Sequence, residues 1–147
     1  MPWFRTERSR VADELEKLYA EYLRLCAQLE AHAEVVPYPQ VGTRLAEIRV
    51  AEEENAKRLA ARLSALGRHP SPSNGARLRG GRNAWERLVG TLEDYRGLLR
   101  QLGHLAARWD DEHPEDAELV EALRASALQH RDALGDLVAR SDPHALD

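Results

Sequence analysis

The sequence has little cysteine, few aromatic residues and no long uncharged apolar run, and each shortage excludes a class of protein. Cys26 is the only cysteine among 147 residues, which excludes an intrachain disulfide and a cysteine-rich metal site. We therefore expect a reducing, cytoplasmic environment. No segment is apolar for long enough to cross a bilayer, and the first residues contain no apolar stretch of signal-peptide length. We expect a soluble, unexported protein with no membrane partner.

The sequence also lacks the common signatures of catalysis and of nucleotide binding. It has no Gly-x-Ser-x-Gly elbow, and Gly80-Gly81 is followed by Arg82 and Asn83 instead of the Lys-Ser/Thr pair of a phosphate-binding loop. The formal net charge of −4 argues against a general nucleic-acid binder, which needs a positive excess. We expect no catalytic residue and no nucleic-acid partner, and the sequence identifies no small-molecule substrate.

What the sequence has in quantity is residues that favour helices. Aromatic residues make up 5%, and long runs rich in Ala, Leu, Glu and Arg alternate with short segments rich in Gly and Pro. This composition predicts an all-α protein, and the length suits one domain over residues 1–147.

Apolar residues recur at spacings of three and four in four segments, which predicts helices over about 7–34, 40–67, 84–109 and 114–140. The first stripe contains Val11, Leu15, Leu18, Tyr22, Leu25, Leu29 and His32. The second contains Val41, Leu45, Ile48, Glu52, Asn55, Leu59, Leu63 and Leu66. The third contains Trp85, Leu88, Leu92, Tyr95, Leu99, Leu102, Ala106 and Trp109. The fourth contains Val120, Leu123, Ala127, His130, Leu134 and Leu137.

Local signals define the predicted helix ends. Thr6 or Ser9 could cap the first helix, and Gly67 is suited to a left-handed stop after the second. Asn83 and Glu86 have the spacing of a capping box at the start of the third helix. Proline in the first turn, before acidic residues, suits the start of the fourth.

The connections between these helices are short, long and short. The long one covers about residues 68–83, which could span about 50 Å when extended, whereas a helix of about 27 residues is about 40 Å long. This pattern predicts a four-helix bundle with one long crossover between the second and third helices. An up-down bundle whose loop folds over one end is the alternative.

Polar residues interrupt the apolar stripes near the middle of each helix. They are Tyr22 in the first helix, Glu52 and Asn55 in the second, Tyr95 in the third and His130 in the fourth. Because the midpoints of helices of similar length share one layer of a bundle, we expect these side chains to form one buried polar layer.

On this layer and on the loop pattern, the chain resembles the ferritin-like superfamily. Residues 51–60 and 65–70 are similar to the second-helix ending of bacterial ferritin-like proteins, as residues 129–134 are to their fourth helix. The family carries a di-iron or di-manganese site made of one Glu from each of two helices and Glu-x-x-His from each of the others. The resemblance implies that Glu52 and His130 occupy ligand positions. It also implies that Tyr22, Asn55, Tyr95 and Ala127 replace ligands, which leaves a degenerate site.

Two interpretations of the layer follow. In the first, Glu52 accepts hydrogen bonds from neighbouring polar groups, and the layer only fixes the helix register. In the second, Glu21 and Glu93 turn inward and join Glu52 and His130 around iron, manganese or zinc. The first predicts a non-catalytic structural or binding protein, and the second a metal-dependent oxidase or storage protein. A helical adaptor for another protein is a third alternative. The resemblance further suggests a homodimer with a bacterial stress-associated role.

Overall fold

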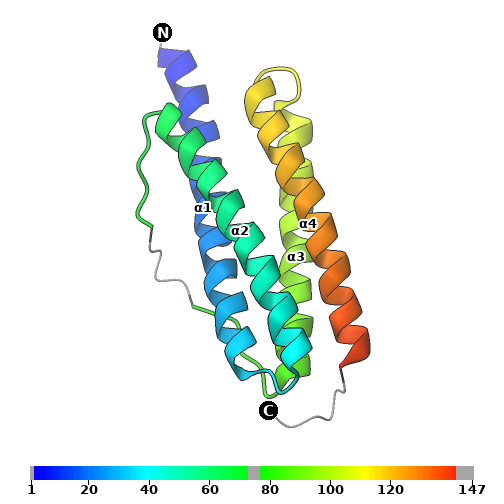
Figure 1. Cartoon of the computed structure of the whole chain (residues 1–147). Helices are drawn as coiled ribbons and strands as arrows, with labels where there is room; N and C mark the ends of the chain where they lie inside the picture. Colours follow the sequence, from blue (N-terminus) through cyan, green and yellow to red (C-terminus); the bar gives the residue numbers. More distant parts are fainter. Residues whose placement is uncertain (1, 73–76, 142–147) are drawn as a thin grey trace. The chain divides into compact units, whose positions relative to one another are not determined.

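The computed structural model describes residues 2–72 and 77–141, with side chains from Glu7 onward, and these residues form four helices and no strand. The helices are α1 (Pro2–Val35), α2 (Pro39–Ala65), α3 (Ala84–Trp109) and α4 (Pro114–Arg140), coloured from blue to red in Figure 1. The all-α prediction is confirmed. In the described ranges, none of the helices combines the length and the apolar character that crossing a membrane requires.

The chain divides into two compact units, each built on one helix pair. The first contains Met1–Glu34 and Pro39–Leu78, and therefore α1 and α2. The second contains Val35–Tyr38 and Arg79–Asp147, and therefore α3 and α4. Each pair is described separately below.

In the first unit, α2 ends as the sequence predicts. Gly67 adopts a positive φ of 79°, its amide donates to the Ser64 carbonyl at 3.0 Å, and the Arg68 amide donates to the Leu63 carbonyl at 2.8 Å. These two bonds form a Schellman motif, which satisfies the last carbonyls of the helix. The Arg68 guanidinium then bonds Asp13 and Glu16 of α1, each at 2.9 Å. The end of α2 is thereby fastened to the first half of α1, so the two helices are antiparallel.

In the second unit, α3 begins at a side-chain cap. The Asn83 side chain accepts a hydrogen bond from the Glu86 amide at 2.9 Å, which is half of the predicted capping box. The Glu86 carboxylate bonds Arg82 instead, accepting from its backbone amide at 3.2 Å and from its guanidinium at 2.9 Å. The bond from the Arg82 amide is the main cause that lowers the pKa of Glu86. Pro114 opens α4 as predicted.

The first helix begins earlier than the predicted start near residue 7. Because α1 extends back to Pro2, Ser9 lies inside the helix and caps nothing, and the side chain of Thr6 lies outside the described set. Proline is tolerated in the first turn of a helix, since the amide it lacks would have no partner inside the helix there. The correction lengthens the helix by about one turn.

The apolar stripes form the core with a few shifts. His32 is buried, as its place in the first stripe predicts, and the fourth stripe is buried throughout. In α3 the core residue is Leu98 and not Leu99, which is half-buried. Leu66 and Trp85, at stripe ends, are also only half-buried. Stripes spaced at 3.5 residues drift relative to a helix of 3.6 residues per turn, which accounts for such shifts.

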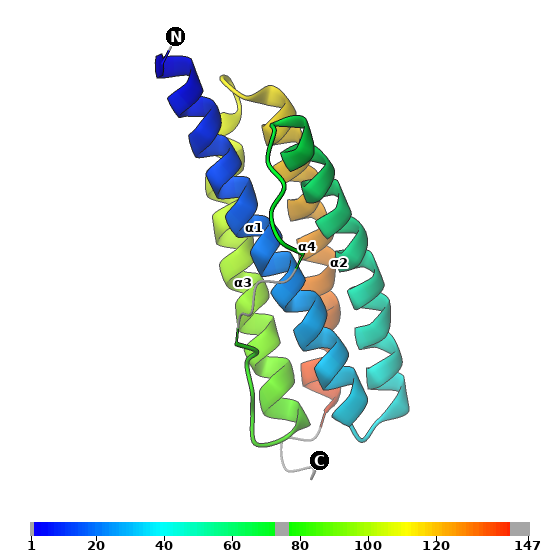
Figure 2. The same cartoon turned by 90° about the vertical axis from the view of Figure 1, so that its left-hand side faces the viewer.

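No helix occurs between α2 and α3 in the described parts of residues 66–83, so the long connection is confirmed. Figure 2 shows the segment after α2 turning back along α1 and the segment before α3 lying against α3. Arg79 bonds Asp94 on α3 at 2.7 Å. The Arg79 side chain can pack against Gly90 because glycine has no Cβ atom, and a Cβ atom there would lie 2.2 Å from Arg79 Cδ.

Candidate functional site

The polar layer predicted from the sequence has its first part on α2. Glu52 is fully buried and Asn55 is 5% exposed. The Asn55 amide nitrogen Nδ2 donates to Glu52 Oε1 at 2.7 Å. Residues three apart face the same side of a helix, so the pair needs no rearrangement to form. A hydrogen bond to a buried carboxylate offsets part of its desolvation.

Tyr22 of α1 is the second member of the layer in this unit. Its ring is fully buried, and its hydroxyl makes no hydrogen bond within the described chain. Burial raises the pKa of this phenol far above its ordinary value, and the negative charge of Glu52 raises it further. Tyr22 is therefore a neutral group beside a carboxylate. It offers no anionic oxygen at any ordinary pH.

Cys26 follows Tyr22 by one helical turn and lies near the same carboxylate. Its thiol is partly buried, and its pKa is raised to about 12. Burial is the largest cause, the charges of Glu52 and Glu53 contribute in the same direction, and Arg49 acts in the opposite direction. The thiol is protonated at neutral pH, so it is a weak nucleophile and a weak metal ligand.

In the second unit, the rings of Tyr95 and His130 make contact. Both are buried, and their ring centroids lie 6.0 Å apart with an interplanar angle of 89°. This edge-to-face contact joins α3 to α4 at the middle of both helices. Ala127, one turn before His130, is buried and contributes only a methyl group.

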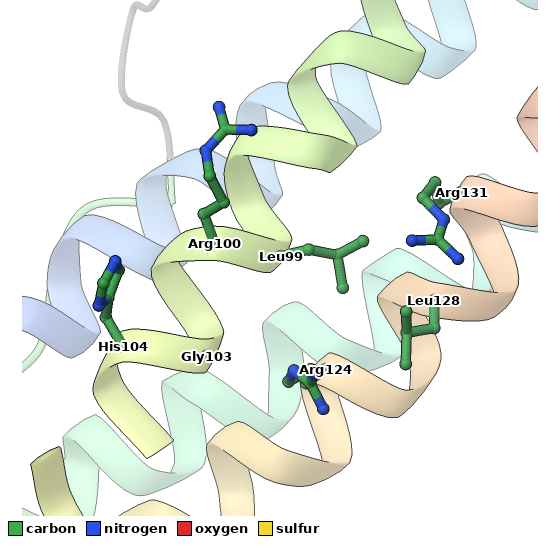
Figure 3. Close-up of a pocket in the computed structure, with 7 residues that line it drawn as sticks. All are labelled: Leu99, Arg100, Gly103, His104, Arg124, Leu128 and Arg131. Atoms are coloured by element: carbon green, nitrogen blue, oxygen red, sulfur yellow. The ribbon is translucent and has the colours of Figure 1, made fainter. Parts of the chain in front are cut away.

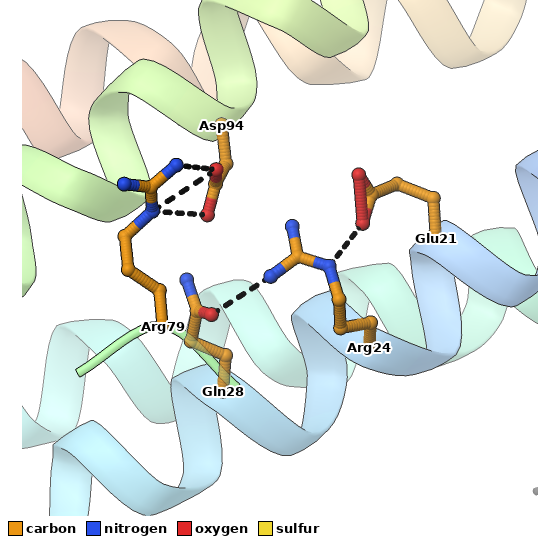
Figure 4. A network of polar contacts seen from close by, with 5 residues as sticks. All are labelled: Glu21, Arg24, Gln28, Arg79 and Asp94. Atoms are coloured by element: carbon orange, nitrogen blue, oxygen red, sulfur yellow. Dashed lines mark hydrogen bonds and ion pairs between the residues drawn. The ribbon is translucent and has the colours of Figure 1, made fainter. Parts of the chain in front are cut away.

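The flanking carboxylates pair with arginines on their own helices. Glu21 accepts from the Arg24 guanidinium, which also donates to the buried Gln28 at 2.9 Å (Figure 4). Glu93 accepts from Arg96, and both side chains are 52% exposed. Figure 4 also shows Asp94 of α3 accepting hydrogen bonds from the Arg79 guanidinium.

Three further buried polar residues were not assigned to the layer from the sequence: Gln28, Thr91 and Asp116. Gln28 and Thr91 each precede a leucine of an apolar stripe, and that position was the only available signal. Asp116 lies in the first turn of α4, where a carboxylate interacts favourably with the helix dipole. Its burial could not be read from the apolar spacing.

The donor chemistry within each unit differs from that of the di-metal centre that the resemblance implies. Such a centre takes carboxylates and imidazoles from four helices. Here Glu52 already accepts from Asn55, Tyr22 is neutral, and Ala127 has no donor atom. Within either unit, the described part of the chain contains no three His, Cys, Asp or Glu side chains whose ligand atoms lie within 4.8 Å of one another.

Comparison with known proteins identifies the fold. No protein-family model matches the chain, and no curated protein matches it in sequence. Among solved structures, a point mutant of Dps1 from Mycobacterium smegmatis matches with a TM-score of 0.78 at 18% identity. The match covers 90% of this chain and 97% of the Dps1 chain. The chain therefore has the ferritin-like four-helix bundle fold.

Proposed function

We propose that this protein is a non-catalytic ferritin-like bundle with a structural or binding role, and that its polar layer stabilises helix packing without holding a metal. The Glu52–Asn55 hydrogen bond carries this proposal. In the ferritin-like pattern, the position of Asn55 belongs to a metal-ligating histidine. An amide that donates to the carboxylate occupies one of the lone pairs that a metal ion would use.

The chemistry of the neighbours supports the same role. The phenol of Tyr22 and the thiol of Cys26 both stay protonated, because burial and the Glu52 charge raise the pKa of each. Divalent transition metals bind the deprotonated forms of such groups. In α4, the imidazole of His130 packs against the Tyr95 ring.

Metal loading tests the proposal. The protein is purified without chelators, soaked separately with Fe(II), Mn(II) and Zn(II), desalted and analysed for bound metal, and Fe(II) oxidation is followed by absorbance. We expect metal well below one ion per chain and no acceleration of Fe(II) oxidation. The matched control is Glu52→Gln, which removes the charge and keeps the shape.

Stoichiometric binding that Glu52→Gln abolishes would contradict the proposal. It would assign a metal-dependent oxidase or storage role to Glu52 and His130, with Glu21 or Glu93 as further ligands. Binding that survives in Glu52→Gln would place the metal elsewhere and leave the proposed role of the layer intact.

A helical adaptor role has less support. It requires a contiguous exposed apolar patch. In the parts of the chain that the structure describes, the large exposed hydrophobic residues are Val35, Val50 and Leu78. They lie at the end of α1, in the middle of α2 and in the connection before α3.

We also propose a cytoplasmic homodimer with a stress-associated role, and measurement of its expression under stress tests that role. The single cysteine supports a reducing compartment, and the ferritin-like resemblance suggests the dimer. Sedimentation equilibrium should give a mass of two chains. A monomer at all concentrations would contradict the dimer, and recovery of the native protein from an exported fraction would contradict the compartment.

A further inference from the structure

A groove of about 410 Å³ lies between α3 and α4 in the second unit, and neither Tyr95 nor His130 lines it. Leu99 of α3 and Leu128 of α4 line it, and both are half-buried (Figure 3). Gly103 leaves space on the α3 side, since a Cβ atom there would meet only Arg124 Nε, at 3.8 Å.

Three arginines and one histidine also line the groove. Arg124 and Arg131 lie on α4 on either side of Leu128, at spacings of four and three residues. Arg100 and His104 lie one turn apart on α3. Figure 3 shows Leu99 extending from α3 toward Leu128 and Arg131 of α4, whereas the side chains of Arg100 and His104 extend away from α4 in this view.

The described residues neutralise little of the positive charge of these arginines. Arg100, Arg124 and His104 form no hydrogen bond or ion pair with the part of the chain that the structure describes. Among the described residues, Arg131 bonds only the neighbouring Asp132, whose side chain is 71% exposed. By contrast, Arg96, one turn before Arg100 on α3, is paired with Glu93. In a chain of net charge −4, such an unneutralised group of cations is a local exception.

We propose that this groove binds a small amphipathic anion, a carboxylate or phosphate group attached to an apolar body. Guanidinium groups bind both anions through paired hydrogen bonds, and Arg124 and Arg131 would hold the charged end. Leu99 and Leu128 would cover the apolar end. The groove volume falls in the usual range for ligand sites, about 300–1,000 Å³.

This inference gives a ligand class to the binding role proposed above and rests on that proposal. The two can fail separately, because the groove contains no residue of the metal test. Metal binding through Glu52 would overturn the first proposal without affecting anion binding, and loss of anion binding would leave the metal result unchanged.

The test is a titration of the full chain with octanoate and with octyl phosphate, followed by amide NMR and calorimetry. Inorganic phosphate and 1-octanol serve as the charge-only and apolar-only probes. We expect saturable changes in amide chemical shift centred on Leu99, Gly103 and Leu128. Inorganic phosphate and 1-octanol should each bind at least about tenfold more weakly than the tighter-binding of the two amphipathic anions. The better anion identifies the head group as carboxylate or phosphate.

The Arg124→Gln/Arg131→Gln double variant should bind at least about tenfold more weakly, a loss of about 1.4 kcal/mol. Arg140→Gln, on the same helix but outside the groove, is the matched control and should bind normally. Three results would overturn the proposal: no shifts at millimolar ligand, equal binding of octanol, or unchanged binding by the double variant. Groove shifts that depend on protein concentration alone would also overturn it, by showing that a second copy occupies the groove.

Discussion

The side-chain amide of Asn55 donates to the carboxylate of Glu52 at 2.7 Å, three residues apart on the buried face of α2. The bond is local to one helix, so it forms wherever the helix forms. Its main effect is on the cost of burying Glu52, since a buried carboxylate that loses a donor keeps its desolvation penalty.

Replacing Asn55 with Ala should therefore destabilise the protein. We expect a loss of about 2 kcal/mol in the free energy of unfolding, because the buried carboxylate loses a charge-assisted hydrogen bond. Urea unfolding followed by circular dichroism measures the change. In Glu52→Gln, where no charge is buried, the further Asn55→Ala change should cost distinctly less. An equal loss of stability in both backgrounds would show that the Asn55 hydrogen bond does not offset the cost of burying the Glu52 charge.

Replacing Tyr22 with Phe should be neutral or should stabilise the protein by up to about 1 kcal/mol. The buried hydroxyl has no hydrogen-bond partner in the described chain, so the variant removes a polar group that folding leaves unsatisfied. Thermal unfolding measures the change, and Tyr22→Ala is the contrasting variant. We expect Tyr22→Ala to cost about 3–5 kcal/mol, as deletion of a large buried ring does. A loss above about 1 kcal/mol for Tyr22→Phe would reveal a partner for the hydroxyl.

The Cys26 thiol gives a prediction with a defined pH range. Its pKa rises from 9.0 to about 12 on folding, so between these values the unfolded chain has released a proton that the folded chain keeps. Stability therefore falls as pH rises through this range, and the contribution is complete below pH 9. Urea unfolding at pH 8 to 11 should show the decline, and Cys26→Ala should decline less steeply. Parallel pH curves for the two proteins would contradict the shifted pKa.

The same shift makes Cys26 slow to alkylate. At pH 8 we expect iodoacetamide to react with the native thiol at least about tenfold more slowly than with the urea-unfolded protein, because only the thiolate attacks. Mass spectrometry of quenched samples measures both rates. Similar rates in the two states would show that the native thiol ionises normally.

The segment before α3 should loosen when its attachment is removed. Asp94→Asn weakens the ion pair with Arg79, and Gly90→Ala places a methyl group where the Arg79 chain lies. Hydrogen exchange should become several-fold faster at residues 79–81 in both variants. The effect on global stability should be small, because exposed ion pairs contribute about 0–1 kcal/mol. Arg96→Gln, which breaks a different pair on α3, is the control and should leave this exchange unchanged.

Much of the fold could be predicted because its signals are local. Gly67 and Asn83 mark helix ends through backbone geometry and a single side-chain bond, which one sequence contains in full. The buried stripes of α2 and α4 follow from spacing alone. The start of α1 was missed because polar residues near it can cap a helix or continue one, and nothing local decides between the two.

The site was less predictable because it depends on which of several available partners each polar side chain contacts. Spacing placed Tyr95 and His130 in one layer, and in the structure their rings make an edge-to-face contact. Spacing could not show whether Glu21 pairs with Arg24, three residues along the same helix, or turns into the core, because both arrangements suit the sequence. The cationic groove was missed for a related reason. It depends on Leu99, a member of the predicted stripe, being only half-buried while the neighbouring Leu98 is buried in the core.

The free energy of unfolding in the presence and absence of metal tests the central claim most directly. A metal that binds only the folded state at 100 times its dissociation constant adds about 2.7 kcal/mol. We predict that urea unfolding curves with EDTA, Mn(II), Zn(II) or anaerobic Fe(II) superimpose. A stabilisation of that size that disappears in Glu52→Gln would contradict the account and identify the polar layer as a metal site.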